Sequence, residues 1–587
     1  MVDLKTGAGD SHASIPEKKP RLWPGVALAA ILFFGMYLLP RIAPGASLAA
    51  VMTGFAAILG ILLWWLFFSR APWLERLGAI ALAAAAMFVT YRFLHPSVAK
   101  GNMGFQYLLL GLPLVGLALV AGAVAGRRQP RGRRRAILAA ALVLASAGPT
   151  LFRSDGVTGA GKPQLVWRFT ASAEEKLLAA GEERATAGGA RAGEEAQGKV
   201  QWPGLRGPNR DGVIGGLRLA TDWSAAPPKE LWRRPIGPGV SSFAISGNLL
   251  FTQEQRGEEE IVSCHDLATG ELVWKHQDRA RFWDAHVGAG PRATPAFAQG
   301  KVYTLGATGI LNALDAATGK VVWSRSAAED GGAKTPMWGF VSSPLVVGDL
   351  LVVQAGSLLA YDLLSGERRW QGPAKRGSYS SPQLLTIAGI PQIVLIGHAA
   401  TISVSPADGS LLWEHPWDGV GIVQPVQIGA GDLLVSLVDG GAVPIGTRRL
   451  AVTKEPAGWK AEERWTSNRL KPSFSDVVIH EGHAYGIDGR IFAAIDVATG
   501  ERAWKGGRYG EGQVLLLPDQ DLLLVFTEEG ELALVEAKPE AFKELALVPL
   551  LAGKSWSQPA LAGDLLLVRN GEEMAAFRLP SAAQPAA

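Results

Sequence analysis

The sequence predicts an all-β fold, an eight-bladed β-propeller, preceded by an all-α domain of five transmembrane helices. Three observations support this. A phrase with Asp, Thr-Gly and Trp occurs five times, Trp residues recur with a period in the forties, and the first 155 residues hold five apolar runs. A period of about 40 to 50 residues is typical of propeller blades. We therefore divide the chain into a membrane anchor at 1–155, a flexible linker at 156–200 and a propeller at 201–587.

The anchor is predicted from its apolar runs. These lie at about 22–39, 46–68, 76–94, 106–126 and 136–152. Most of them reach the ~20 residues that a helix needs to cross the bilayer core. Because four further apolar runs follow the first, a cleaved signal peptide is not expected.

Basic residues in the short loops predict the orientation of the anchor. They are Lys5, Lys18, Lys19 and Arg21 before the first run, Arg70 and Arg76 between the second and third, and Arg127, Arg128, Arg131, Arg133, Arg134 and Arg135 between the fourth and fifth. With five crossings all three clusters fall on one side, which should be cytoplasmic. We expect a bacterial inner (cytoplasmic) membrane protein with a cytoplasmic N-terminus and a periplasmic propeller. This position explains the arginines, so no nucleic-acid partner is expected.

Each copy of the repeated phrase is predicted to form a β-hairpin. The copies run over 266–274, 315–323, 362–370, 405–413 and 496–504, and Ser405 replaces the Asp in the fourth. A carboxylate can accept hydrogen bonds from the amides of a turn, and glycine tolerates the positive φ of a tight reversal. We assign these Asp and Trp residues to turns and blade packing rather than to catalysis.

The Trp spacing predicts the number of blades. Successive copies lie 49, 47, 43 and 91 residues apart, and Trp465 divides the last interval. Trp232 lies 42 residues before the first full copy, so eight units fit. The last unit ends before its Trp strand. We therefore expect the strand around Trp232 to complete the last blade and close the ring.

The phrase AxDxxTGxxxW resembles the repeat of pyrroloquinoline quinone (PQQ) propellers. That group includes quinoprotein dehydrogenases and the lipoprotein propeller of the outer-membrane β-barrel assembly machine. The resemblance covers about residues 200 to 580. The segment WPGLRGPNRDGV at 202–213, with GPRATP, MWGF and GGRYG further on, is similar to a widespread set of bacterial propellers. The resemblance implies the fold and leaves the function open.

A candidate ligand site is expected where the first strand of each blade begins, because these strands line the central channel of a propeller. The candidate ligand-binding residues are Arg292, Trp338, Gln424, Lys471, Arg508, Gln513, Trp556 and Gln558. The cations could hold an anionic ligand, and the Trp rings could offer a stacking face. The alternative, in which the small residues simply fit a crowded axis while Arg and Trp brace loops, stays open.

Two functions follow from this organisation. The first is a binding or scaffolding module, anchored in the lipid bilayer, with a periplasmic or inner-membrane protein partner and no cofactor or metal. The alternative is a PQQ-dependent membrane quinoprotein dehydrogenase that oxidises sugars or alcohols and passes electrons to ubiquinone. The resemblance implies that such an enzyme needs Ca²⁺ or Mg²⁺ held by carboxylates, and the candidates are Asp284, Asp476 and Glu511, with Asp284 and Glu511 as candidate catalytic residues.

Three observations favour the binding module. Cys264 is the only cysteine, so the adjacent cysteine pair of many quinoprotein alcohol dehydrogenases is absent. The propeller spans about 380 residues, which is short for that group. His480 and His483 fall at a strand-turn-strand, where two histidines three apart would rarely share a metal.

Overall fold

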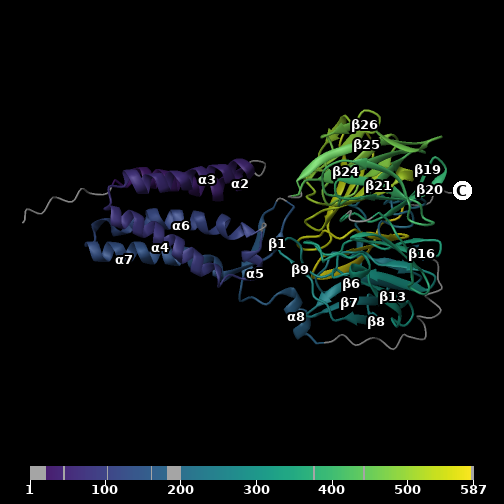
Figure 1. Ribbon diagram of the computed structural model, residues 1–587, viewed down its shortest axis with the longest axis horizontal. Helices are drawn as coiled ribbons and strands as arrows, with labels where there is room; N and C mark the ends of the chain where they lie inside the picture. Colours follow the sequence, from purple (N-terminus) through teal and green to yellow (C-terminus); the bar gives the residue numbers. More distant parts are fainter. Residues whose placement is uncertain are drawn as a thin grey trace, which may run out of the picture. The chain divides into compact units, whose positions relative to one another are not determined.

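The computed structural model describes residues 21–43, 47–101, 104–159, 161–181, 200–373, 377–440 and 443–582. The chain forms two compact units. The first holds residues 1–156 and 163–170, and the second holds residues 157–162 and 171–587. Figure 1 shows a helical unit at the N-terminal end of the chain and a unit built of sheets.

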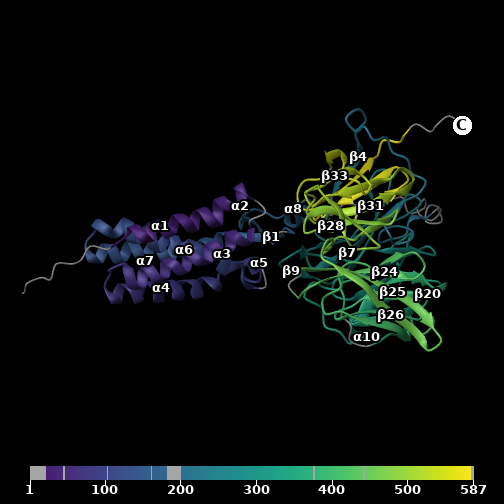
Figure 2. The ribbon, with the colours of Figure 1, turned by 90° about the horizontal axis from the view of Figure 1, so that it is seen from above.

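The helical unit contains, among its described residues, five helices that are long and apolar enough to cross a membrane. These spans are Trp23–Ile42, Ala49–Phe68, Trp73–Tyr91, Gln106–Arg128 and Arg131–Leu151. They are built from α1 (Trp23–Phe33), η1 (Phe34–Leu38), α2 (Leu39–Ile42), α3 (Ser47–Leu63), η3 (Trp64–Phe68), α4 (Trp73–Tyr91), α6 (Gln106–Ala125), η5 (Gly126–Arg128), α7 (Arg131–Ala147) and η6 (Gly148–Leu151), with the short α5 (Pro96–Ala99) before α6. The helices pack as a bundle, in which α6 contacts α1, α3, α4 and α7 (Figure 2).

The last span begins earlier than the predicted residue 136. Helix α7 starts at Arg131, so most of the basic cluster lies in its first turns. A buried carboxylate explains this start. Glu75, in the first turn of α4, accepts hydrogen bonds from Arg134 Nη2 at 2.9 Å and Arg135 Nε at 3.0 Å. Because the guanidinium groups have a partner, the helix continues through a sequence that we assigned to a loop.

Among its described residues the second unit contains eight sheets of four or five strands in a propeller arrangement, and we number these blades in chain order. A two-stranded sheet of β9 (Trp283–Asp284) and β10 (Gly288–Ala289) lies in the loop between blades 1 and 2. Blade 1 holds β5 (Ala244–Ser246), β6 (Leu249–Arg256), β7 (Glu259–Asp266) and β8 (Leu272–Asp278), with β3 (Val200–Trp202) paired to β5. Blade 2 holds β11 (Ala296–Ala298), β12 (Lys301–Leu305), β13 (Ile310–Asp315) and β14 (Val321–Ser326). Blade 3 holds β15 (Leu345–Val347), β16 (Leu350–Ala355), β17 (Ser357–Asp362) and β18 (Arg368–Gln371). Blade 4 holds β19 (Gln383–Ile387), β20 (Ile390–Ile396), β21 (Ala400–Val404) and β22 (Leu411–Pro416).

The remaining blades follow the same order. Blade 5 holds β23 (Val426–Ile428), β24 (Asp432–Val438), β25 (Pro444–Glu455) and β26 (Gly458–Ser467). Blade 6 holds β27 (Val478–His480), β28 (His483–Asp488), β29 (Ile491–Asp496) and β30 (Arg502–Lys505). Blade 7 holds β31 (Gln513–Leu517), β32 (Leu522–Phe526), β33 (Glu531–Glu536) and β34 (Glu544–Pro549). Blade 8 holds β35 (Ala560–Ala562), β36 (Leu565–Arg569), β37 (Glu573–Arg578) and β4 (Lys229–Pro235).

The predicted ring closure is confirmed. Strand β4 pairs antiparallel with β37, and Trp232 lies opposite Ala576. The outermost strand of the last blade therefore comes from a segment that precedes blade 1 in the chain. The predicted blade around Trp465 is also confirmed, since this residue lies in β26 opposite Arg449.

The repeated phrase joins several blades to their neighbours. Asp315 Oδ1 accepts a hydrogen bond from Thr318 N in its own turn at 2.9 Å, and Gly319 has φ +69°. The Trp of the preceding blade packs on that glycine, and its indole Nε1 donates to the carbonyl after the Asp. These bonds are Trp232 to Leu267 O, Trp274 to Ala316 O, Trp323 to Leu363 O and Trp465 to Val497 O, with Trp370 to Pro406 O after Ser405 as the counterpart in the fourth copy. Trp504 donates to Lys538 O of blade 7, which has no copy of the phrase, and Trp413 donates to Gln392 Oε1 of its own blade. The assignment of these residues to turns and packing is confirmed.

Ordered elements also lie between the two predicted domains. They are β1 (Phe152–Val157), β2 (Pro163–Trp167) and α8 (Ala173–Ala179). Helix α8 begins with a capping box in which Ser172 Oγ accepts from Glu175 N at 3.1 Å and Glu175 accepts from Ser172 N at 2.6 Å. Residues 182–199 of the expected linker lie outside the described residues.

Candidate functional site

A ring of hydrogen bonds surrounds the channel axis. Every blade except blade 7 contributes one residue just before the start of its first strand: Ser242, Thr294, Ser343, Ser381, Gln424, Asp476 and Gln558. The backbone N–H groups of the first five donate in turn to the side chain of the next blade's residue, with lengths of 3.2, 2.9, 2.9, 2.8 and 2.6 Å. Gln558 Nε2 donates to Asp476 Oδ2 at 3.1 Å, and Ser242 Oγ donates to the Gln558 carbonyl at 2.6 Å. The ring therefore fixes the spacing of the blades.

A plug, which we define as residues 202–214, fills the channel on one side of this ring. It enters past the C-terminal end of β5, where Val200 pairs with Ser246, and it leaves beside Leu516 near the end of β31. Between these points Pro203 O accepts from Phe297 N at 2.7 Å. The plug thus contacts first strands of several blades, and the channel is not open from end to end.

Two arginines of the plug bind backbone carbonyls beside the ring. Arg210 Nη1 donates to Pro344 O at 2.9 Å, and its Nη2 donates to Ser343 O and Pro382 O at 3.3 Å each. Arg206 Nη2 donates to Val477 O at 2.8 Å. Burial, together with the charge of Arg206, lowers the pKa of Arg210 to about 10. Sequence reasoning noted this segment as a motif but missed its place, because its partners lie in blades 3, 4 and 6.

The mouth, on the other side of the ring, carries a row of aromatic side chains. Trp338, Tyr379, Phe474 and Trp556 come from four different loops between blades, and all four are half-buried. The ring centroids of Trp338 and Tyr379 are 4.7 Å apart, those of Trp338 and Phe474 are 6.3 Å apart, and Phe474 stacks on Trp556 at 5.3 Å. Half-buried aromatic rings in one row offer a partner a large apolar surface with little side-chain entropy to lose.

Two carboxylates are buried at the edge of this row. Glu511 and Glu528 are 3% and 1% exposed. Glu511 accepts a hydrogen bond from Ser473 Oγ at 3.2 Å, and Glu528 accepts from Trp556 Nε1 at 3.2 Å and pairs with Arg490 Nη2 at 3.3 Å. Burial, followed by the charge of Glu528, raises the pKa of Glu511 to about 7.

The structure places the predicted site residues in different settings. Gln424 and Gln558 belong to the hydrogen-bond ring, and Trp338 and Trp556 belong to the aromatic row. Gln513 Nε2 donates instead to the carbonyls of Phe474 and Trp556 at 3.2 and 3.3 Å. Lys471 pairs with the fully buried Asp488 at 2.7 Å, and Arg508 is exposed. Whether any of them binds a ligand stays a prediction.

Arg292 is 7% exposed, and its hydrogen bonds go to residues of its own loop. Its Nη2 pairs with Asp284 Oδ2 at 2.6 Å and donates to Gly288 O at 2.7 Å. Asp284 also accepts from His286 N at 2.7 Å and Val287 N at 3.0 Å. Burial lowers the pKa of Arg292, and the Asp284 carboxylate acts in the opposite direction.

Within the described residues, one group of side chains has the spacing of a metal site. His480, Glu481 and Asp521 each offer one ligand atom within 4.8 Å of the others. His480 Nε2 lies 2.8 Å from Asp521 Oδ1, and Glu481 is exposed. His483 is not part of this group, since its Nδ1 contacts the Glu481 carbonyl at 3.1 Å. A hydrogen bond therefore joins His480 to Asp521.

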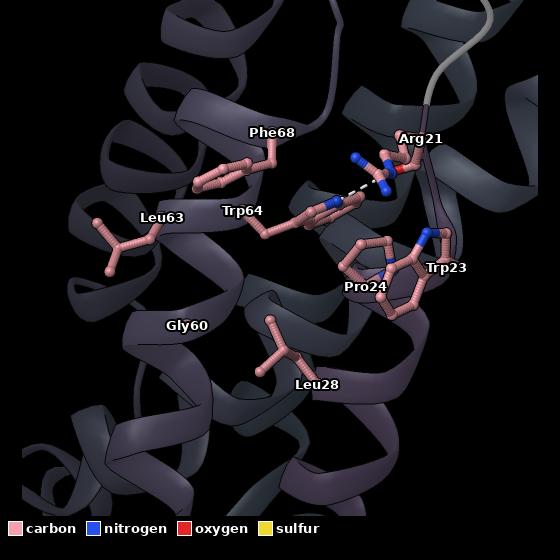
Figure 3. Close-up of a pocket in the computed structure, with 8 residues that line it drawn as sticks. All are labelled: Arg21, Trp23, Pro24, Leu28, Gly60, Leu63, Trp64 and Phe68. Atoms are coloured by element: carbon pink, nitrogen blue, oxygen red, sulfur yellow. Dashed lines mark hydrogen bonds between the residues drawn. The ribbon is translucent and has the colours of Figure 1, made fainter.

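A cavity of about 320 Å³ lies in the helical unit between α1 and the end of the second span (Figure 3). It is lined by Arg21, Trp23, Pro24, Leu28, Gly60, Leu63, Trp64 and Phe68. Trp64 Nε1 donates to the Arg21 carbonyl at 2.9 Å, which closes one end. The lining is apolar except for Arg21 and contains no carboxylate, histidine or tyrosine.

The family model that matches this chain covers part of the propeller. A family model described as outer membrane protein assembly factor BamB matches residues 258–506 and 398–577. The BamB of Burkholderia pseudomallei is 24% identical over 338 residues, which is 47% of this chain and 84% of the relative. The BamB of Shewanella oneidensis is 30% identical over 155 residues, which is 24% of this chain and only 36% of the relative.

Solved structures of similar fold include two kinds of protein. BamB from Moraxella catarrhalis aligns with a TM-score of 0.43 and 14% identity over 61% of this chain and 99% of its own. The quinohemoprotein alcohol dehydrogenase of Comamonas testosteroni aligns with a TM-score of 0.47 and 14% identity over 71% and 86%. The two matches of the family model together span residues 258–577, which is more than half of the chain. The protein therefore belongs to the family described as outer membrane protein assembly factor BamB.

Proposed function

We propose that this protein is a membrane-anchored propeller whose mouth binds a protein partner outside the cytoplasm. The aromatic row of Trp338, Tyr379, Phe474 and Trp556 carries the proposal. Aromatic residues are enriched at the centres of protein interfaces. The indole Nε1 of Trp338 is buried and finds no hydrogen-bond acceptor among the described residues, so a partner could supply one. The relatives are named assembly factors, which agrees with a function that depends on binding other proteins.

The partner test uses the full chain in its native membranes. Trp338→Ala/Trp556→Ala removes two rings of the mouth, and Trp459→Ala removes a half-buried ring from the β25–β26 hairpin as a control. After cross-linking and affinity purification, we expect the same partner with wild type and Trp459→Ala and a loss of roughly tenfold or more with the double variant. An unchanged yield of every cross-linked partner in the double variant would refute the proposal.

The orientation is proposed from the arginines. The ends of the spans at Arg70, Arg127 and Arg128 and the start of α7 fall on one side if the five spans cross in turn. That side is cytoplasmic by the distribution of positive charge. Reporters fused after residues 130 and 200 test this. We expect an extracytoplasmic reporter to be active only at 200, and activity at 130 alone would reverse the topology.

The dehydrogenase alternative has less support from the geometry. Asp284 is paired with Arg292, Asp476 is part of the hydrogen-bond ring, and Glu511 is held by Ser473, so the three carboxylates do not fit a shared Ca²⁺ or Mg²⁺ ion of a PQQ site. The cavity of the helical unit also lacks a group to exchange protons with a quinone. We propose that no PQQ is used. Dye-linked oxidation of sugars or alcohols on addition of PQQ and Ca²⁺, lost in Glu511→Gln, would contradict this.

A further inference from the structure

The mouth holds a segment of the chain itself. Residues 157–162 belong to the propeller unit, and they form a tight turn that we call the tip. Thr158 N donates to Lys162 O at 2.9 Å, and Gly161 N donates to Thr158 O at 2.8 Å. Val157 is 5% exposed, so the start of the tip is buried.

The tip contributes backbone groups to the hydrogen bonds that join it to the mouth in the described residues. Val157 N donates to His286 O at 2.9 Å, and Val157 O accepts from Lys554 Nζ at 3.3 Å. Gly159 N donates to Glu528 Oε1 at 2.6 Å. The mouth thus recognises main-chain groups of the tip, much as the edge of a sheet binds an added strand.

The space at Gly159 selects for glycine. A Cβ placed on this residue would overlap Glu511 Cγ and would lie 3.2 Å from Glu511 Oε1 and from Glu528 Oε2. The φ of Gly159 is not in the left-handed region, so the selection arises from space rather than from backbone strain. Any side chain at this position would have to displace one of the two buried carboxylates.

The Glu528 carboxylate also needs the donor that the tip provides. It is 1% exposed, and its like-charged neighbour Glu511 adds repulsion. A buried carboxylate that loses a hydrogen-bond donor is costly. Without the tip, Glu528 keeps Trp556 and Arg490 as partners and loses the Gly159 N–H, so another peptide N–H at that place would stabilise the emptied mouth.

We propose that the mouth is a receptor for a glycine-containing polypeptide turn, and that the tip is its resident ligand in cis, which a partner must displace. This proposal rests on the proposed protein-binding function and names what the mouth recognises. The tip is covalently attached and acts at an effective concentration in about the millimolar range. A partner turn must therefore bind more tightly than the tip or bring contacts of its own to the aromatic row.

The experiment uses the purified full chain and a fluorescein-labelled peptide with the sequence of residues 153–166. Gly159→Val excludes the tip from the mouth, whereas Lys162→Ala alters an exposed side chain of the same turn and serves as a control. By fluorescence anisotropy we expect the peptide to bind Gly159→Val at least roughly tenfold more tightly than it binds wild type or Lys162→Ala. A peptide with Val in place of its first glycine after Thr should not bind, and adding Glu528→Ala to Gly159→Val should abolish binding.

Hydrogen exchange supplies a second measurement that does not depend on the peptide. The amides of the tip should exchange slowly in wild type and Lys162→Ala and much faster in Gly159→Val and Glu528→Ala, while the blades stay protected. Equal exchange of the tip in all four proteins, or equal peptide binding by wild type and Gly159→Val, would overturn the proposal. Peptide binding as expected, with no partner affected by the aromatic variants, would instead refute the protein-binding function alone.

Discussion

Trp232 Nε1 donates a hydrogen bond to the carbonyl oxygen of Leu267 at 3.0 Å. Trp232 lies in the outermost strand of blade 8, and Leu267 follows the Asp of the first repeat in blade 1. The same kind of contact that joins blades 1, 2, 3, 5 and 6 to the blades that follow them thus also joins the last blade to the first. Because the propeller is a closed ring, loss of this one contact should weaken all eight blades together.

We expect Trp232→Ala to lower the free energy of unfolding of the propeller by about 3 to 5 kcal/mol, since the ring is 7% exposed and its removal leaves a cavity. Trp459→Ala, at a half-buried position of the β25–β26 hairpin, is the control and should cost far less. Urea unfolding followed by tryptophan fluorescence measures both. Equal midpoints for the two variants would contradict the role of Trp232 in closure.

The glycine of the repeat can be tested separately from its turn. A Cβ on Gly319 would lie 2.5 Å from Trp274 Cε3, whereas a Cβ on Gly348 would meet no atom within 4 Å, although the two glycines have φ of +69° and +61°. Gly348→Ala should cost about 1 to 2 kcal/mol from backbone strain alone. Gly319→Ala should cost clearly more, because Trp274 must also move. Thermal melts with the same shift for both would show that the packing of Trp274 on Gly319 is unimportant.

The plug should tolerate no other cation at residue 210. Arg210 binds three carbonyl oxygens from blades 3 and 4, and a lysine ammonium cannot span them in the same plane. We expect Arg210→Lys to lower the free energy of unfolding by about 2 to 4 kcal/mol, because carbonyl groups stay buried without a donor. Arg218→Lys, whose Nη1 contacts Asp519 O at an exposed position, is the matched control. Unfolding curves that overlap for the two variants would argue against the plug as a structural element.

The raised pKa of Glu511 predicts a dependence of stability on pH. Below its ordinary pKa of 4.5 the carboxyl is protonated in both states, and stability is greatest. As the pH rises toward 7, the unfolded chain releases the proton and the folded one keeps it, so stability falls. The full loss is on the order of 3 kcal/mol. Glu511→Gln should therefore be more stable than wild type at pH 8 and similar at pH 5 in urea unfolding. The same pH dependence in both proteins would exclude Glu511 as the cause.

The sequence predicted those parts of the fold that repeat. The spacing from Trp232 to Trp504 predicted the blades and their closure, because most blades repeat the same turn glycine and the same packed Trp at a regular interval. The basic cluster at 131–135 was assigned to a loop, because its partner Glu75 is remote in the chain.

The candidate site was predicted only in part. The starts of the first strands do converge, and Gln424 and Gln558 belong to one hydrogen-bond ring. Their hydrogen bonds, however, join different blades, and no periodic pattern shows which atoms meet. No sequence pattern predicts the contact of Arg210 with Pro382 or that of Gly159 with Glu528, because each is a single contact between distant segments.

Because of the plug and strand β4, folding of the propeller depends on the order in which its segments are synthesised. The ribosome synthesises both segments before the strands that they bind. Arg206 can therefore bind the Val477 carbonyl, and Trp232 can pair with Ala576, only after those later residues have been synthesised. Until then the nascent protein carries an unpaired strand edge and two arginines without their acceptors, a state prone to aggregation and proteolysis. A chain that terminates before residue 573 lacks β37 and cannot complete its last blade. The N-terminal segment thus makes the finished fold conditional on complete translation.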